Sequence, residues 1–254
     1  VDPSAKPLSL CWVDRLGPKM AMLDGVTITH RRARFLHQGV HGTRLNESAL
    51  RERIALHGKS LFERGYGCGS SGNISHRVED GLLVTPTNSC MGRLDPARIS
   101  KLSPAGDLLA GDKPSKEAFL HLAMYRERPD AKAIVHLHST YSVALSCLAD
   151  IDPSDVLPPI TAYAVMRVGK LPLVPYFRPG DMALAEAVAK FAKAHHAVLL
   201  ANHGPVVAGK ELDSAVYAAE ELEETAKLHL LLRGCDVRLL TAEQVAELRE
   251  TFPS

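Results

Sequence analysis

Histidines in three apolar settings are the residues of this sequence best suited to chemistry. His136 and His138 alternate within the apolar run 133–138, and His203 follows the apolar run 197–201. Side chains two residues apart on a strand leave the same face about 7 Å apart, so two imidazoles can meet one metal ion. Three imidazole ligands leave a coordination position open for substrate, as in catalytic zinc sites. The trio therefore predicts a zinc centre, with another borderline divalent ion as the alternative.

Simpler interpretations exist for each of these residues. A lone buried histidine is commonly a hydrogen-bonded core residue, and structural zinc usually has four ligands rich in cysteine, of which none adjoins these histidines. Glu117 lies near the start of a predicted helix, where a carboxylate can stabilise the helix end. The alternative role for Glu117 is that of an acid or base beside the metal.

Three short loops of small residues, hydroxyls and one cation could bind an anion. Their candidate residues are Gly72, Asn73, Ser75, Thr87, Asn88, Ser115 and Lys116. Backbone amides at turns and helix starts accept phosphate, and the lysine adds positive charge. Each loop is also an ordinary turn or cap, so the hypothesis requires that the loops meet in space.

The segments that carry these residues predict a layered α/β domain. Helices are expected over 46–65, 115–126, 183–195 and 212–233, and strands over 74–78, 82–85, 133–138, 162–168, 173–174 and 197–201. Alternation of strands and helices by itself suggests parallel βαβ units. No internal repeat or long linker divides the chain after residue 46.

Residues 1–45 differ from the remainder of the chain. They contain scattered prolines and the basic cluster 30–34, without apolar periodicity. We expect a peripheral N-terminal arm there, or a remnant without function, and a catalytic domain over 46–254.

Bulk composition narrows the partners and the compartment. Charged residues make up 23%, hydrophobic residues 46%, and the formal net charge is +1, so neither nucleic acid nor a membrane surface is expected as a partner. Five scattered cysteines without a Cys-x-x-Cys pair argue against a disulfide framework and favour a reducing cytoplasm. No apolar stretch reaches the roughly 18 residues of a membrane span.

Taken together, these motifs resemble the class II aldolase and adducin head family, of the fuculose-phosphate aldolase and ribulose-phosphate epimerase type, over about residues 46–240. The matching motifs are Gly72-Asn73-Ile74-Ser75, Thr85-Pro86-Thr87, Ser115-x-Glu117, His136-Leu137-His138 and Asn202-His203-Gly204. The resemblance implies a single three-layer α/β/α domain with a mostly antiparallel sheet, in place of the parallel arrangement. It also implies a homotetramer with sites between subunits.

The resemblance assigns roles residue by residue. It implies that His136, His138 and His203 are zinc ligands, and that Glu117 is an acid or base that also ligates the metal when substrate is absent. It implies that phosphate is bound by Gly72, Asn73, Thr87, Asn88, Ser115 and Lys116. Two positions depart from the aldolases, which often have Gly at the position of Asn88 and a second Ser at the position of Lys116.

Four further stretches, 87–94, 113–117, 165–169 and 175–181, look most like the 3-oxo-tetronate 4-phosphate decarboxylase branch. This implies zinc-dependent loss of carbon dioxide from a small phosphorylated sugar acid, through a metal-bound enediolate, to give dihydroxyacetone phosphate. Glu117 would deliver the proton, which requires a raised pKa in the closed site. A class II aldolase or epimerase acting on a neutral sugar phosphate, and a non-catalytic adducin-like interaction module, are the alternatives.

Some substrate contacts stay open at this level. Lys116, Asn88 and Arg93 are candidates for reading the carboxylate or the phosphate, with a solvated surface role as the alternative for Arg93. A tyrosine could assist from a neighbouring subunit, and the candidates are Tyr141, Tyr163 and Tyr176, each of which could instead serve packing.

Overall fold

The computed structural model describes residues 46–178 and 180–252, so the expected arm at 1–45 lies outside the described residues. The described residues belong to one compact unit. Within these ranges, none of the helices combines the length and the apolarity needed to cross a bilayer.

One sheet of eight strands forms the centre of the described unit. Its order is β4 (Leu108–Ala110), β3 (Ser100–Leu102), β2 (Gly81–Val84), β1 (Asn73–Val78), β5 (Ala133–His136), β8 (Gly204–Gly209), β7 (Ala197–Leu200) and β6 (Leu173–Val174). Every neighbouring pair is antiparallel except β6 and β7. The mostly antiparallel sheet is confirmed, and the parallel arrangement suggested by simple alternation is wrong.

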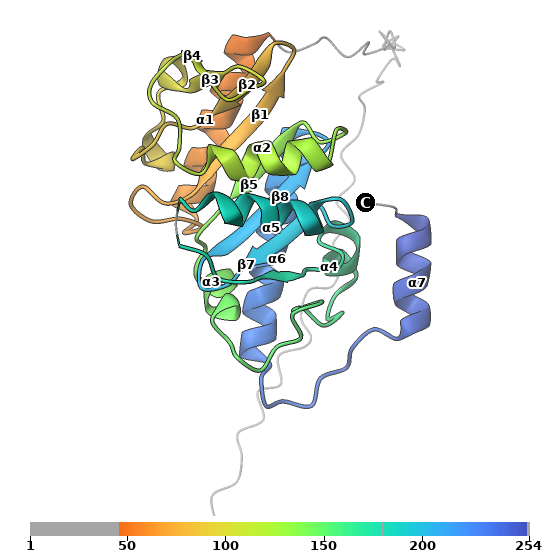
Figure 1. Ribbon diagram of the computed structural model, residues 1–254. Coiled ribbons are helices and arrows are strands. Elements are labelled where there is room, and N and C mark those ends of the chain that lie inside the picture. The colour runs from red at the N-terminus through yellow and green to blue at the C-terminus, as the bar shows by residue number, and fades with distance from the viewer. Residues whose placement is uncertain (1–45, 179, 253–254) are drawn as a thin grey trace, which may run out of the picture. The chain divides into compact units, whose positions relative to one another are not determined.

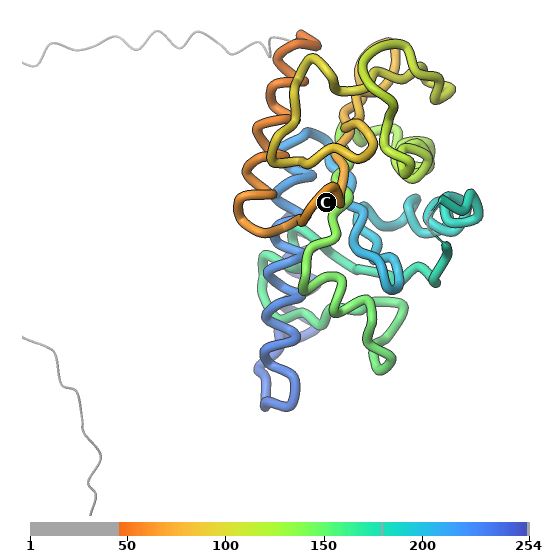
Figure 2. Tube along the Cα trace, turned by 90° about the vertical axis from the view of Figure 1, so that its left-hand side faces the viewer, coloured from red at the N-terminus to blue at the C-terminus, as the bar shows by residue number. Residues whose placement is uncertain are grey.

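Helices cover both faces of this sheet (Figures 1 and 2). The helices α1 (Glu47–Glu63), α3 (Thr140–Ser146) and α6 (Leu212–Leu231) share one apolar core with the sheet, and α2 (Ala118–Glu127) and α5 (Met182–Ala192) share the other. Successive residues of β5 serve opposite cores, with Val135 facing α1 and α6 and Ile134 facing α2 and α5. The expected three-layer α/β/α architecture is therefore confirmed.

One predicted strand is wrong. Residues 162–168 form helix α4 (Ala162–Arg167), whose N-cap Thr161 accepts a hydrogen bond from the Ala164 amide at 3.0 Å. A short apolar run cannot be assigned to helix or strand by periodicity alone, and here the cap decides for a helix. The sequence reading also left out β3, β4, β8, α3, the terminal helix α7 (Ala242–Thr251), and the short 3-10 turns η1 (Met91–Arg93) and η2 (Pro96–Arg98).

The short helix α3 joins two parts of the fold that carry the candidate histidines. At its start, the buried Glu223 of α6 accepts hydrogen bonds from the amides of Tyr141 and Ser142, both at 2.8 Å. At its end, the carbonyl of Ser146 accepts from the Asn202 amide at 3.2 Å, and its hydroxyl accepts from the His203 amide at 3.3 Å. Helix α3 thus fixes the turn after β7 relative to the segment after β5.

A glycine is required where β8 begins beside the end of β5. Gly204 has φ +157°, and a Cβ added there would lie 2.2 Å from the carbonyl oxygen of Leu137. The obstructing atom belongs to the backbone, so it cannot rotate away. The close approach holds His203 and His138, the residues next to this contact, at a fixed separation.

We expect Gly204→Ala to lower the free energy of unfolding by about 3 kcal/mol, the upper end of the usual cost of overpacking, because the contact is with backbone. Gly65→Ala is the matched control, because Gly65 has φ +82° but no heavy atom within 4 Å of an added Cβ. That control should lose only about 1 kcal/mol, from backbone strain alone. Denaturant unfolding of both variants measures the two losses, and equal losses would refute the steric argument.

Candidate metal centre

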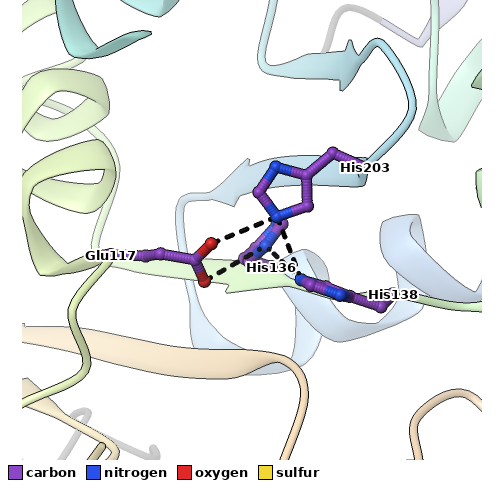
Figure 3. Close-up of side chains that lie close together, drawn as sticks. All are labelled: Glu117, His136, His138 and His203. Carbon is purple, nitrogen blue, oxygen red and sulfur yellow. Dashed lines mark hydrogen bonds and ion pairs between the residues drawn. The ribbon is translucent and has the colours of Figure 1, made fainter. Parts of the chain in front are cut away.

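Four side chains from separate segments converge beside the centre of the sheet (Figure 3). Glu117 is the N-cap residue of α2, His136 ends β5, His138 follows two residues later, and His203 lies in the turn between β7 and β8. One ligand atom of each of these residues lies within 4.8 Å of the ligand atoms of the other three. The structure therefore brings together all four residues predicted to bind metal.

Individual distances show how closely the four groups face one another. The Nε2 atom of His138 lies 3.0 Å from Nε2 of His136 and 3.1 Å from Nε2 of His203. The carboxylate of Glu117 places Oε1 3.1 Å from His203 Nε2 and Oε2 3.4 Å from His136 Nε2. In the metal-binding form, in which every Nε2 atom is unprotonated, the lone pairs would repel at these separations, so the arrangement fits a shared cation.

A backbone contact sets the orientation of His136. Its ring is fully buried, and Nδ1 lies 2.8 Å from the carbonyl oxygen of Pro205. A carbonyl only accepts, so Nδ1 carries a proton, and when the ring is neutral its Nε2 lone pair faces the cluster. Hydrogen bonds of this kind from the outer ring nitrogen are typical of metal-bound histidines.

Charge within the cluster opposes the effect of burial on Glu117. Burial raises the pKa of this carboxyl, but attraction and hydrogen bonding to His136 and His203 outweigh it, so its pKa is lowered. This is opposite to the shift that a proton donor needs. Burial, followed by repulsion from His136 and His203, lowers the pKa of His138 to about 4, which keeps that ring in its neutral, ligating form.

The six residues that the family resemblance assigns to phosphate lie around one pocket of about 270 Å³, whereas Ser75, the seventh candidate of the three loops, is buried and does not line it. The pocket is lined by Gly72, Asn73, Thr87, Asn88, Ser115 and Lys116, together with Glu117 and His138. The loops meet because the Thr87 amide donates to the Lys113 carbonyl at 2.9 Å and the Ser115 amide donates to the Thr85 carbonyl at 3.1 Å. The structure thus satisfies the requirement that the three loops converge.

Asn88 and Lys116, the two positions that depart from the aldolases, both line this pocket. Asn88 has φ +55°, a conformation that glycine adopts freely and that asparagine tolerates better than most residues. Lys116 is exposed and forms no ion pair with the residues in 46–178 and 180–252. Arg93 lines an adjoining pocket of about 370 Å³ that shares Thr87 and Asn88.

A second pocket, of about 600 Å³, also includes the cluster. Tyr176, Phe177 and Asn202 line it together with Glu117, His138 and His203. Tyr176 is 62% exposed. Tyr141 and Tyr163 line neither of the two pockets that contain Glu117 and His138.

Sequence reading missed a buried chain of polar side chains behind Glu117. Asn73 donates from Nδ2 to Glu117 Oε2 at 2.8 Å, and its Oδ1 lies 2.5 Å from His121 Nε2. His121 Nδ1 lies 2.6 Å from the Ser75 hydroxyl, which in turn lies 2.9 Å from the Tyr125 hydroxyl. The available signal was the four-residue spacing of Glu117, His121 and Tyr125, which places polar groups on one face of a buried helix.

The relatives of the chain are consistent with this geometry. The family model described as Class II Aldolase and Adducin N-terminal domain matches residues 52–230. A 3-oxo-tetronate 4-phosphate decarboxylase of Pectobacterium atrosepticum is 54% identical over 213 residues, covering 84% of this chain and 98% of the relative. An L-fuculose phosphate aldolase of Methanocaldococcus jannaschii is 37% identical over 173 residues, covering 68% of this chain and 91% of the relative.

Among solved structures, that of YgbL from Escherichia coli superposes with a TM-score of 0.79 at 53% identity, covering 80% of this chain and 99% of that chain. The fold, the sequence match and the family model agree over the segments that carry Glu117, His136, His138 and His203. The chain therefore belongs to the class II aldolase and adducin N-terminal domain family.

Proposed function

We propose that this protein is a lyase that decarboxylates 3-oxo-tetronate 4-phosphate, giving dihydroxyacetone phosphate and carbon dioxide. The observation that carries the proposal is the metal-ligand cluster of Glu117, His136, His138 and His203 at the border of a pocket built from small residues, hydroxyls and Lys116. Two decarboxylases of this name are 54% and 55% identical to the chain, and each match spans almost the whole length of the relative. A non-catalytic interaction module would have no need of this donor set.

The substrate itself favours the reaction. Its ketone at C3 is β to the carboxylate, so loss of carbon dioxide leaves an electron pair at C2 that flows into the C3 carbonyl. The resulting enediolate takes up one proton at C2 and becomes dihydroxyacetone phosphate. A divalent cation held by His136, His138 and His203, with the substrate in place of Glu117, would act as a Lewis acid that polarises the C3 carbonyl and lowers the cost of the developing negative charge.

Glu117 is the residue that we assign to deliver the proton. In the structure its pKa is lowered because the carboxylate faces His136 and His203. Substrate that displaces Glu117 from the cluster would remove this attraction, while burial, which raises the pKa, would remain. The protonated fraction of Glu117 would then increase as the substrate enters, when the acid is needed.

We assign the phosphate to the pocket of Gly72, Asn73, Thr87, Asn88, Ser115 and Lys116. Small residues let an anion approach the backbone amides, and Lys116 supplies a positive charge that no described carboxylate neutralises. The phosphate would hold the substrate with its reacting carbons toward Glu117 and His138, which border the same pocket.

Further assignments complete the proposal. Zinc suits an imidazole-rich site with one carboxylate and an open position. We propose a homotetramer with sites between subunits, as the family resemblance implies, and a mass measurement in solution would test it.

The four described cysteines are free, which supports a cytoplasmic location. Residues 1–45 are proposed as a peripheral arm, and 46–254 as the catalytic domain.

The first prediction concerns turnover. Zinc-loaded protein supplied with 3-oxo-tetronate 4-phosphate should release carbon dioxide and dihydroxyacetone phosphate in equal amounts. His136→Ala removes a ligand and Glu117→Gln removes the acid, so each should lower kcat by at least about 100-fold. Aldehyde formation from a ketose 1-phosphate without carbon dioxide would instead establish the aldolase alternative, and inactivity on both substrates would favour the interaction module.

The second prediction concerns the metal. Removal of divalent ions by a chelator should abolish turnover, and zinc should restore it better than manganese or cobalt. Zinc at about 1,000 times its Kd should also raise the free energy of unfolding by about 4 kcal/mol, because the ion binds the folded state. His138→Ala should lose this stabilisation, and calorimetry with and without zinc measures it; equal stabilisation in the variant would place the metal elsewhere.

The third prediction concerns the phosphate. Lys116→Met keeps the length of the side chain but removes its charge, so KM should rise about tenfold while kcat changes little. Lys113→Met is the control, since Lys113 is exposed in the same loop but does not line the pocket. Steady-state kinetics compares the two variants, and an equal rise in KM for both would point to general surface charge.

A further inference from the structure

We propose that His121 is a positioning residue that orients Asn73, and through Asn73 the carboxylate of Glu117. The inference rests on the proposed function, since it concerns how the proton donor of that reaction is held. His121 lies one helical turn beyond Glu117 in α2 and touches neither pocket that contains the cluster. Its ring is fully buried, and both of its nitrogens have a side-chain partner.

The donor and acceptor of each hydrogen bond between Glu117, Asn73 and His121 can be assigned in turn, beginning at the Glu117 carboxylate. An ionised carboxylate only accepts, so Asn73 must present its amide N–H to Glu117 Oε2, at 2.8 Å. The amide oxygen of Asn73 then faces His121 Nε2 at 2.5 Å and needs a proton there. Nε2 of His121 is therefore the protonated ring nitrogen.

The other side of the ring completes the assignment. Burial, with repulsion from His136 as a second cause, lowers the pKa of His121 to about 3, so the ring is neutral and carries one proton. With that proton on Nε2, Nδ1 must accept, and the Ser75 hydroxyl at 2.6 Å is its donor. Since Ser75 gives its proton to Nδ1, it accepts from the Tyr125 hydroxyl at 2.9 Å, and the same Tyr125 proton is shared with the Lys132 carbonyl at 3.2 Å.

The sheet explains why these groups meet beneath α2. Asn73 and Ser75 are two residues apart on β1, so their side chains leave the same face, toward His121 and Tyr125 of the helix. On the neighbouring strand, Asn73 pairs with His136. The polar chain thus begins where the metal-ligand cluster begins and ends at a backbone carbonyl.

Without a donor at His121, the amide of Asn73 loses its preferred orientation. Rotation of that amide by half a turn would point its oxygen at Glu117, and two acceptors would then repel where Asn73 is buried. Glu117 would be displaced from the position at which it meets the substrate. Small displacements of this kind reduce the rate of the chemical step more than the affinity for substrate.

Two substitutions at one position separate positioning from packing. His121→Leu replaces the ring with an apolar side chain of similar size that has no hydrogen-bond donor. We expect kcat to fall about 10–100-fold, with KM changed by less than about threefold. His121→Gln offers an amide N–H near the place of Nε2 and should recover most of kcat. Equal losses in the two variants, at equal zinc content and equal folded fraction, would overturn the proposal.

Coupling to Glu117 gives a second readout that a merely structural role would not change. In the Glu117→Gln background, His121→Leu should change the residual kcat by less than about threefold, because the group it orients is already absent. A full additional loss in the double variant would show that His121 acts independently of Glu117. Tyr125→Phe is the control at the far end of the chain, and its effect should be smaller than that of His121→Leu.

A third readout does not depend on the reaction. Nitrogen NMR of the histidine rings at neutral pH should show His121 protonated at Nε2 and unprotonated at Nδ1, and Ser75→Ala should weaken that preference. The opposite tautomer, or a doubly protonated ring, would overturn the proposal even if wild-type protein turned over 3-oxo-tetronate 4-phosphate. If wild-type protein is inactive but the tautomer is as stated, the proposed function fails and the positioning of Asn73 by His121 stands.

Discussion

Three imidazoles and one carboxylate lie within 4.8 Å of one another, and in the unprotonated state that binds metal they do not hold themselves together. In the form that binds metal, the rings would present lone pairs to one another across 3.0 and 3.1 Å, and one of them is fully buried, where repulsion is weakly screened. A shared cation relieves this repulsion, and until it binds the surrounding fold must resist it. The other features of the site, from the sheet to the polar chain behind Glu117, hold the four side chains in place against this repulsion.

Three of the four residues, His136, His203 and Glu117, are held by a backbone element and by one further contact outside the cluster. His136 ends a central strand and donates to the Pro205 carbonyl, and His203 sits in a hairpin turn tied to α3 by Ser146. Helix α3 is in turn attached to α6 by the buried Glu223. Glu117 begins a helix, but its side chain does not cap that helix and points instead into the cluster. Because these supports come from distant parts of the sequence, the cluster is rigid only when the whole domain is folded.

The sequence was sufficient to identify the four residues that converge in the cluster and the six pocket residues, because their types and local spacing carry the signal. The i, i+2 pair His136 and His138 could be placed on one face although β5 ends at His136, since the period of an extended chain persists one step further. The strand predicted over 162–168 was wrong because a short apolar run fits either a strand or a helix, and the Thr161 cap favours the helix. The sheet order could not be derived from alternation, because β8 follows β7 through a tight turn that glycine makes possible. His121 was missed because a lone histidine in a helix resembles a core residue until its partners are known.

The position of the cluster between two pockets bears on how one ligand set could serve related reactions. One pocket, with Lys116 and the glycine-rich turn, suits an anion, while the other is bordered by Tyr176, Phe177 and Asn202. In the proposed reaction the phosphate on C4 and the departing carboxylate on C1 are at opposite ends of the substrate. A substrate whose phosphate occupies the first pocket would therefore direct the bond that breaks toward the second. An aldolase of the same family would release an aldehyde on that side, so the choice between the two reactions would depend on the residues of the second pocket and leave the metal ligands unchanged.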